Sequence, residues 1–351
     1  METKFLSTAI GSMPFDKPDY AIEVSLTNLD APIWPQLPKF GLLEQMEIQY
    51  SEGIPCATIE KDKGRMYFQT DIDYSEGFAE FYEKYMAATE EGASLDFMAI
   101  SENYSKGLYA LEKTLKAKGG KLPWLKVQTT GPCSFALTIV DEKKRALWYN
   151  EEFRDVIVKA LALKCRWQLQ KFAKYADKQI CFIDEPILSA FGSSTYVSVK
   201  REDVVAAIAE VIDAVHAEGG LAGIHCCGNT EWSILIDAGV DIVNFDAFGY
   251  GETIAMYAKH VKKHLAKGGM LAWGVVPTSA EIRKQTVETL EAQLEKVMDG
   301  LAATGISKDT IIKQAILTPS CGTGSLEVSD AERVFSLLNQ LSKRMKAKYG
   351  F

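Results

Sequence analysis

Soft metal ligands follow two apolar, strand-like runs of this sequence. The run 221–224 leads into His225 and Cys227, and the run 315–318 is soon followed by Cys321. Because successive side chains of a strand alternate between its two faces, His225 and Cys227 are predicted to share one face. One imidazole and two thiolates form a donor set that favours zinc and leaves a fourth position open. The sequence therefore predicts a zinc site built from two separate strand ends.

The cysteines also have a simpler interpretation, because a lone free cysteine is usually a small buried core residue. A His-x-Cys pair at one strand end and a Cys-Gly pair at another favour metal binding instead. Ligands spread over separate strands suit an open catalytic site better than a closed structural one, whose cysteines typically lie in close Cys-x-x-Cys pairs. We therefore expect one zinc position to exchange with a substrate.

Strands and helices alternate through the middle and C-terminal parts of the chain. Apolar periodicity predicts strands at 6–10, 95–100, 124–130, 179–183, 221–226, 240–245, 270–276 and 314–319. It predicts helices at 151–175, from about 201, and at 231–238, 252–267, 279–303 and 328–347. Helices between successive strands imply right-handed crossovers and a parallel sheet, and eight strands are enough to close a TIM (β/α)8 barrel. The predicted fold class is α/β, with an open doubly wound sheet as the alternative.

The stretch 20–93 fits this alternation least. Residues 32–38 contain three prolines, too many for a central strand, and 59–73 resembles a hairpin at an edge. We interpret 20–93 as an irregular insertion that covers the barrel mouth. Because we find no linker and no internal repeat, residues 1–351 are predicted to form a single barrel domain.

Polar residues stand at the ends of several predicted strands. They include Ser12, Glu102, Asp184 and Asp246. In a barrel these ends meet at the C-terminal face, where active sites lie. A carboxylate in such a place can also merely cap the next helix or pair with a lysine, so Glu102 and Asp184 retain both interpretations.

Composition excludes several classes of function. The chain has a formal charge of −8, which argues against a nucleic-acid partner, since that would need a clustered basic face. No apolar run approaches the roughly 20 residues that span a bilayer. The first residues of the sequence do not have the pattern of a signal peptide. Seven cysteines, an odd number, suit a reducing compartment better than a disulfide framework. The expected location is cytoplasmic, with no membrane partner.

Taken in order, the strand-end residues resemble the catalytic barrel of cobalamin-independent methionine synthase. The resemblance spans nearly the whole chain and rests on Ile10-Gly11-Ser12, Leu95-Asp96 to Glu102, Thr130-Gly131-Pro132, Ile183-Asp184-Glu185-Pro186, His225-x-Cys227 and Cys321-Gly322. The segment 225–229 is also similar to the zinc-dependent corrinoid:coenzyme M methyltransferases, which share the broader uroporphyrinogen decarboxylase superfamily.

The resemblance implies a set of zinc ligands. They are His225, Cys227 and Cys321, and both families usually complete the set with a glutamate. This sequence offers Asp246 instead, so a shorter side chain must reach the metal or give way to water.

The resemblance also implies a substrate pocket for the amino-acid part of homocysteine, formed by Ile10, Gly11, Ser12, Glu102 and Asp184. The two acids suit an ammonium group, and Ser12 with its neighbouring amides suits a carboxylate. Coenzyme M carries a sulfonate and no ammonium, so these acids favour homocysteine.

The implied activity is zinc-dependent methyl transfer to the homocysteine thiol, forming methionine. Coordination to zinc removes the proton of a thiol, whose ordinary pKa is about 8.5, and keeps the sulfur nucleophilic. Full-length cobalamin-independent methionine synthases resemble a tandem of two barrels, and this chain has room for the catalytic one only. We therefore expect a corrinoid donor, either methylcobalamin or a methylated corrinoid protein, as in the short core methionine synthases.

Three alternatives remain open. The first is methyl transfer from a corrinoid to coenzyme M or another small thiol. The second is a uroporphyrinogen decarboxylase-like lyase, against which the His-x-Cys pair and Cys321 argue, because that chemistry needs no metal. The third is a non-catalytic protein that binds zinc or a corrinoid for a partner.

Overall fold

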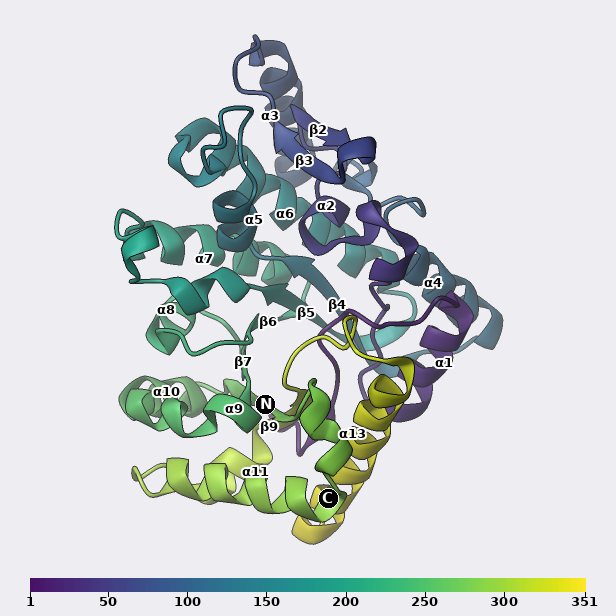
Figure 1. Ribbon diagram of the computed structural model, residues 1–351, viewed down its shortest axis with the longest axis vertical. Helices are drawn as coiled ribbons and strands as arrows, with labels where there is room; N and C mark the ends of the chain where they lie inside the picture. The colour runs from purple at the N-terminus through teal and green to yellow at the C-terminus, as the bar shows by residue number, and fades with distance from the viewer.

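Seven parallel strands form one curved sheet at the centre of the molecule (Figure 1). The computed structural model describes residues 1–351. Along the sheet the strands follow the order β1-β9-β8-β7-β6-β5-β4. Their bounds are β1 Leu6–Ser7, β4 Leu122–Thr130, β5 Ala176–Asp184, β6 Leu221–Cys226, β7 Ile242–Phe245, β8 Met270–Val276 and β9 Ala315–Pro319. The curved sheet with helices packed outside it makes the fold an α/β barrel of the TIM type, as the alternation of elements predicted.

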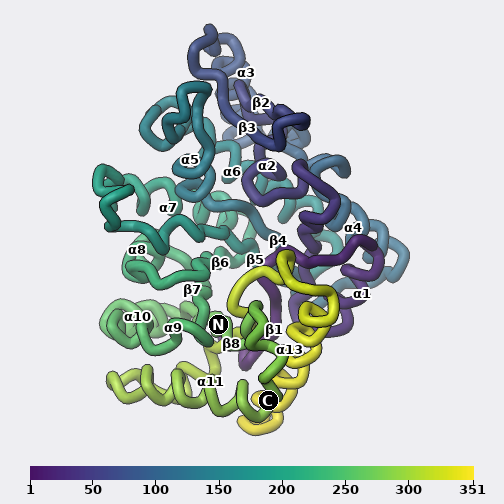
Figure 2. The backbone as a smooth tube through the Cα atoms, in the orientation of Figure 1, coloured from purple at the N-terminus to yellow at the C-terminus, as the bar shows by residue number.

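Helices cover the outer face of the sheet, and Figure 2 follows the chain as it winds between the two layers. The helices are α1 Pro18–Asn28, α2 Met46–Gln49, α3 Ser75–Glu90, α4 Lys106–Lys118, α5 Pro132–Thr138, α6 Glu151–Phe172, α7 Arg201–Ala217, α8 Trp232–Asp237, α9 Ala247–Tyr250, α10 Ala258–Ala266, α11 Val287–Ala302, α12 Lys308–Lys313 and α13 Val328–Tyr349. Local sequence sets their ends: the Asn150 side chain caps α6, and Thr286 with Thr289 forms a capping box at α11. None of these helices is both long and apolar enough to cross a membrane.

The barrel interior has an apolar floor. Alternate strand residues point inward because a strand repeats every two residues. The inward-facing apolar side chains form a cluster of their own, separate from the larger core under the helices: Leu6, Ile10, Ala31, Ile180, Phe182, Ile242, Met270, Ala272 and Ile316. Further along the same strands the inward positions become polar, with Asp184, His225 and Asn244 near the carboxyl ends. These three polar side chains are therefore gathered at the C-terminal face of the barrel, above the apolar floor.

The wall between β1 and β4 is closed by residues 31–36 and not by a regular strand. Ala31 N donates to Ser7 O at 3.0 Å, and Gln36 N donates to Gly11 O at 3.1 Å. On the other side, Lys126 N donates to Pro32 O at 2.8 Å. The segment makes only isolated bridges, because prolines lack the N–H that a continuous ladder needs. As expected, this proline-rich segment forms no regular strand, but the interpretation of it as part of an insertion over the barrel mouth is wrong for residues 31–36, which form part of the wall.

The predicted strand 95–100 is also wrong. Its centre is a 3-10 helix, Asp96–Met98, and the buried residues Leu95, Met98 and Ile100 belong to the outer core rather than to the barrel interior. One residue of the outer helix α6 holds it in place, because Lys164 Nζ donates to Met98 O at 3.2 Å. The apolar residues of 95–100 resemble a strand in sequence because they are buried, although their backbone pairs with no other strand.

The stretch 20–93 divides into parts with different positions. Helix α1 belongs to the outer layer and packs beside α4 and α13, whereas Gln36 and the loop from Pro38 to Met46 line the cavity described below. The hairpin expected within 59–73 is present as β2 Ala57–Glu60 and β3 Arg65–Phe68, paired antiparallel. With α3 it lies at one end of the molecule, beyond α5 and α6 (Figure 1).

Candidate metal centre

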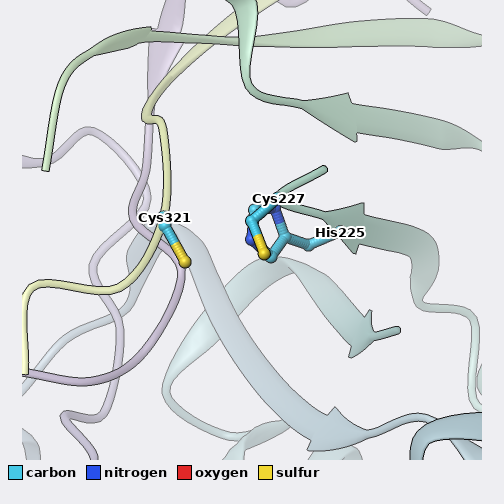
Figure 3. Close-up of side chains that lie close together, drawn as sticks. All are labelled: His225, Cys227 and Cys321. Carbon is cyan, nitrogen blue, oxygen red and sulfur yellow. The ribbon is translucent and has the colours of Figure 1, made fainter. Parts of the chain in front are cut away.

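Three soft donors meet at the C-terminal face of the barrel. His225 lies near the end of β6, Cys227 follows that strand, and Cys321 follows β9. Their ligand atoms all lie within 4.8 Å of one another. Figure 3 shows the imidazole and the Cys227 sulfur at the end of one strand and the Cys321 sulfur on the loop that faces them. Strands β7 and β8 separate β6 from β9 in the sheet, so the curvature of the barrel wall brings the donors together.

A hydrogen-bond relay fixes the imidazole. Asn244 Nδ2 donates to Ala272 O at 2.9 Å and to Thr318 Oγ1 at 2.8 Å. Because a carbonyl oxygen can only accept, Asn244 must turn its own Oδ1 toward His225, whose Nδ1 lies 2.6 Å away. Nδ1 is therefore the protonated nitrogen, and Nε2 carries a free lone pair. Nε2 is buried and has no partner within the protein.

The pKa values of the two thiols are shifted in opposite directions. A hydrogen bond from Cys321 and then the proximity of His225 lower the pKa of Cys227 to about 4. The neighbouring Cys227 thiolate and burial raise the pKa of Cys321. A metal cation would take the place of the shared proton and hold both sulfurs as thiolates. An orphaned imidazole nitrogen beside two sulfurs fits zinc, whose tetrahedral sites use these donors.

Asp246, the expected fourth ligand, is not part of this cluster. Its carboxylate caps α9, where Oδ1 accepts from Gly249 N at 2.7 Å. Burial raises the pKa of Asp246, and the charges of His225 and Cys227 also act on it, so it lies in the same neighbourhood. The structure thus brings together three donors and uses the aspartate for a helix cap.

A cavity of about 390 Å³ opens above the donors. Its lining includes Ile10, Ser12, Gln36, Glu44, Asp184, His225, Cys227, Cys321 and Gly322. Small residues keep Ser12 in place: a Cβ on Gly322 would lie 2.1 Å from Ser12 Oγ, and Gly324 N donates to that oxygen at 3.2 Å. Gly11, next to Ser12, has no room for a side chain because a Cβ would lie 2.7 Å from Gln36 Oε1.

Asp184 is the free carboxylate of the cavity. It is 4% exposed, its side chain accepts no hydrogen bond from the protein, and its Oδ1 is fully buried. Burial raises the pKa of Asp184, while the charges of Lys126 and His225 oppose that rise. A buried carboxylate without a donor is costly unless a ligand supplies one.

Glu185, the neighbouring acid, faces the other way. It accepts from Cys133 N at 2.9 Å and from Ser134 N and Oγ at 2.7 Å, at the start of α5. Only Asp184 of this pair is therefore available to a ligand.

The structure does not bring Glu102 to the cavity. Glu102 is exposed in the turn before α4 and is absent from the lining. The second carboxylate of the lining is Glu44, which accepts from Leu37 N at 3.1 Å and from Lys106 N at 2.8 Å. Sequence inspection missed Glu44 because it lies in the irregular mouth loop, where no periodic pattern marks it.

No protein-family model and no curated protein matches the sequence. By structure the chain is similar to a methyltransferase from Methanosarcina mazei, with a TM-score of 0.57 and 15% identity, over 97% of this chain and 94% of that one. It is also similar to a B12-independent methionine synthase from Shewanella sp. W3-18-1 in complex with selenomethionine, with a TM-score of 0.45 and 13% identity, over 70% of this chain and 67% of that one. The first likeness extends over almost all of both chains and shows a shared fold.

Proposed function

We propose that this protein is a zinc-dependent methyltransferase that moves a methyl group from a methylated corrinoid to the thiol of homocysteine, forming methionine. One observation carries the proposal: a histidine with its Nε2 lone pair free and two cysteines open into a cavity that holds an unpartnered carboxylate. The methyltransferase from Methanosarcina mazei, which shares the fold, is consistent with this class of activity.

His225, Cys227 and Cys321 would hold the zinc. Three protein donors are one fewer than zinc's usual four, and catalytic sites keep the fourth place for water or substrate. Bound there, zinc supplies a way to keep a substrate thiol deprotonated and nucleophilic at neutral pH. Asn244 keeps the imidazole in the tautomer that this role requires.

The chain's own polar groups orient the acceptor. Asp184 is placed to accept hydrogen bonds from a substrate ammonium, because its oxygens have no other donor. The hydroxyl of Ser12 also lines the cavity; its oxygen accepts from Gly324 N, and its own proton can be donated to a substrate carboxylate. The cavity volume of about 390 Å³ suits an amino acid.

The methyl donor must approach from outside. A cavity of about 390 Å³ holds an amino acid but not a corrin ring, so the corrinoid would dock at the mouth. The loop from Pro38 to Met46 forms part of that mouth and would meet the donor.

The first test follows the absorbance of methylcobalamin as it loses its methyl group. Purified zinc-loaded protein is mixed with homocysteine, with coenzyme M, or with no thiol, and methyl-tetrahydrofolate is tried as a separate donor. We expect turnover with homocysteine and methylcobalamin. Turnover with coenzyme M alone would contradict the acceptor, and turnover with methyl-tetrahydrofolate alone would contradict the donor.

Serine variants test the zinc ligands. Cys227→Ser and Cys321→Ser are expected to lose bound zinc and at least 100-fold in methyl transfer, because oxygen is a poorer ligand for this soft site. Cys226→Ser is the matched control, since Cys226 is buried on the opposite face of the strand. Metal content is measured by mass spectrometry. A Cys227→Ser or Cys321→Ser protein that kept full activity without bound zinc would contradict the mechanism.

A further inference from the structure

Gln36, the last residue of the wall segment 31–36, carries an amide oxygen that has no partner. The residue lines the cavity and is only 6% exposed. Its Nε2 donates to Gln49 Oε1 at 2.7 Å and, more weakly, to the Tyr50 hydroxyl at 3.5 Å. No group of the protein donates to its Oε1, and this oxygen is not fully buried. Gln36 therefore offers the cavity a free acceptor.

Two buried neighbours fix the direction of the Gln36 amide. Gln49 Nε2 donates to Tyr104 O at 2.7 Å, and because a carbonyl oxygen can only accept, Gln49 turns its own Oε1 toward Gln36. The hydroxyl of Tyr50 gives its proton to Gln128 O at 2.9 Å, so it too can only accept from Gln36. Both neighbours require the nitrogen of Gln36, and its oxygen is left for the cavity.

A substrate ammonium needs more acceptors than Asp184 alone provides, because it carries three N–H donors. The second carboxylate of the lining, Glu44, already accepts from two backbone amides and from a glutamine side chain. Gly11 leaves room for the free oxygen of Gln36, since a Cβ there would lie 2.7 Å from it. Gln36 Oε1 is thus the neutral acceptor that remains available to an amine in this cavity.

We propose that Gln36 is a specificity-determining residue: its Oε1 accepts a hydrogen bond from the amino group of the thiol substrate, and Gln49 is the positioning residue that keeps this oxygen turned to the cavity. The inference rests on the proposed function, because it assumes that the cavity receives an aminothiol. A thiol without the amino group would cover this oxygen and supply no donor, which penalises its binding.

The test compares the binding of two thiols to the zinc-loaded protein by calorimetry under reducing conditions. One is L-homocysteine, and the other is 4-sulfanylbutanoic acid, which lacks only the amino group. The dissociation constant of the second divided by that of the first measures amine selection. Gln36→Met keeps the length of the side chain and removes the acceptor, so it is expected to lower this ratio about tenfold with zinc content unchanged.

Gln168→Met is the matched control. Gln168 is fully buried on α6 and supports the same wall segment from outside the barrel, where its Oε1 accepts from Trp34 Nε1 at 2.9 Å. This variant should leave the ratio as in the wild type. The inference would be overturned if Gln36→Met weakened both thiols equally or left the ratio unchanged, or if Gln168→Met lowered the ratio as much.

Gln49→Met tests the orientation of the amide and covers the case in which Gln36→Met fails to fold. Gln49 is fully buried and does not line the cavity, so it can act on the substrate only through its neighbours. Without it the Gln36 amide can turn its nitrogen toward the substrate, and the ratio should fall several-fold. In the double variant the ratio should fall no further than in Gln36→Met alone.

An unchanged ratio in Gln49→Met, or an additive loss in the double variant, contradicts the inference. A wild type that binds both thiols equally contradicts it as well. A wild type that selects homocysteine through Gln36 but methylates no thiol would instead overturn the proposed function alone.

Discussion

The free Nε2 of His225, the atom that could hold a metal, depends on a residue that does not line the cavity. Asn244 donates its two amide protons to Ala272 O and Thr318 Oγ1. Only its Oδ1 therefore remains to bond the imidazole of His225. The tautomer of His225 is thus set by the neighbouring strands. Partners of this kind commonly change metal affinity by about 10- to 100-fold when they are removed.

Asn244→Leu is therefore expected to weaken zinc binding by about 10- to 100-fold, because the Nδ1 proton loses its acceptor while the side-chain volume is nearly kept. Competition with a chromophoric chelator measures the affinity. Gln314→Leu is the control, since its buried amide also donates to two carbonyls, Leu265 O and Gly269 O, away from the site. Equal zinc affinity in Asn244→Leu and wild type would contradict the relay.

At the scale of elements, helix α4 rests directly on the wall segment 31–36. Gly107 of α4 has no room for a side chain, because a Cβ there would lie 1.9 Å from Pro35 O, a backbone atom that cannot turn away. The same helix start supports the mouth loop, since Lys106 N donates to Glu44. A displacement of α4 would therefore disturb both the barrel wall and the cavity rim.

Gly107→Ala is expected to destabilise the protein by about 1–3 kcal/mol through overpacking. Gly300→Ala, in α11, is expected to raise the free energy of unfolding by roughly 0.5–1 kcal/mol. A Cβ at this position would meet nothing within 4 Å, and alanine has a higher helix propensity than glycine. Urea unfolding of both variants gives the comparison. A Gly107→Ala protein as stable as the wild type would show that α4 does not pack on this wall as described.

Sequence patterns predicted the strands that form regular hydrogen-bonded ladders. They did not predict the wall segment 31–36, which makes only isolated bridges. Strands β4 to β9 were predictable because each is an apolar run that stops at Gly, Pro, Asp or Cys, and the donors His225, Cys227 and Cys321 stand at such stops. The wall segment was missed because its prolines remove the ladder that a strand pattern reflects.

At the scale of the whole molecule, the donor cluster joins distant parts of the chain. His225 and Cys227 follow β6, while Cys321 follows β9, so a bound metal would link two sectors of the barrel. Binding to the folded state alone stabilises by about 2.7 kcal/mol at a free concentration 100 times the dissociation constant.

Zinc-loaded protein is therefore expected to melt several degrees above the chelator-treated form, and the difference should grow with free zinc. Differential scanning calorimetry at a series of zinc concentrations measures it. Cys227→Ser and Cys321→Ser should lose most of the zinc-dependent shift, because each removes a ligand. An identical melting temperature with and without zinc in the wild type would show that the cluster does not hold the metal in the folded state.

The pairing of the first strand with the last has a consequence for how the chain folds as it is made. Leu6 and Ser7 of β1 pair with Ile316 and Leu317 of β9, and Phe5 N donates to Ala315 O at 2.8 Å. A chain synthesised from its N-terminus therefore carries β1 without this partner until residues 315–319 have emerged, and such non-local pairings form slowly. Cys321 emerges directly after β9. The nascent polypeptide thus gains its closed wall and its complete set of sulfur donors in the same late step of synthesis.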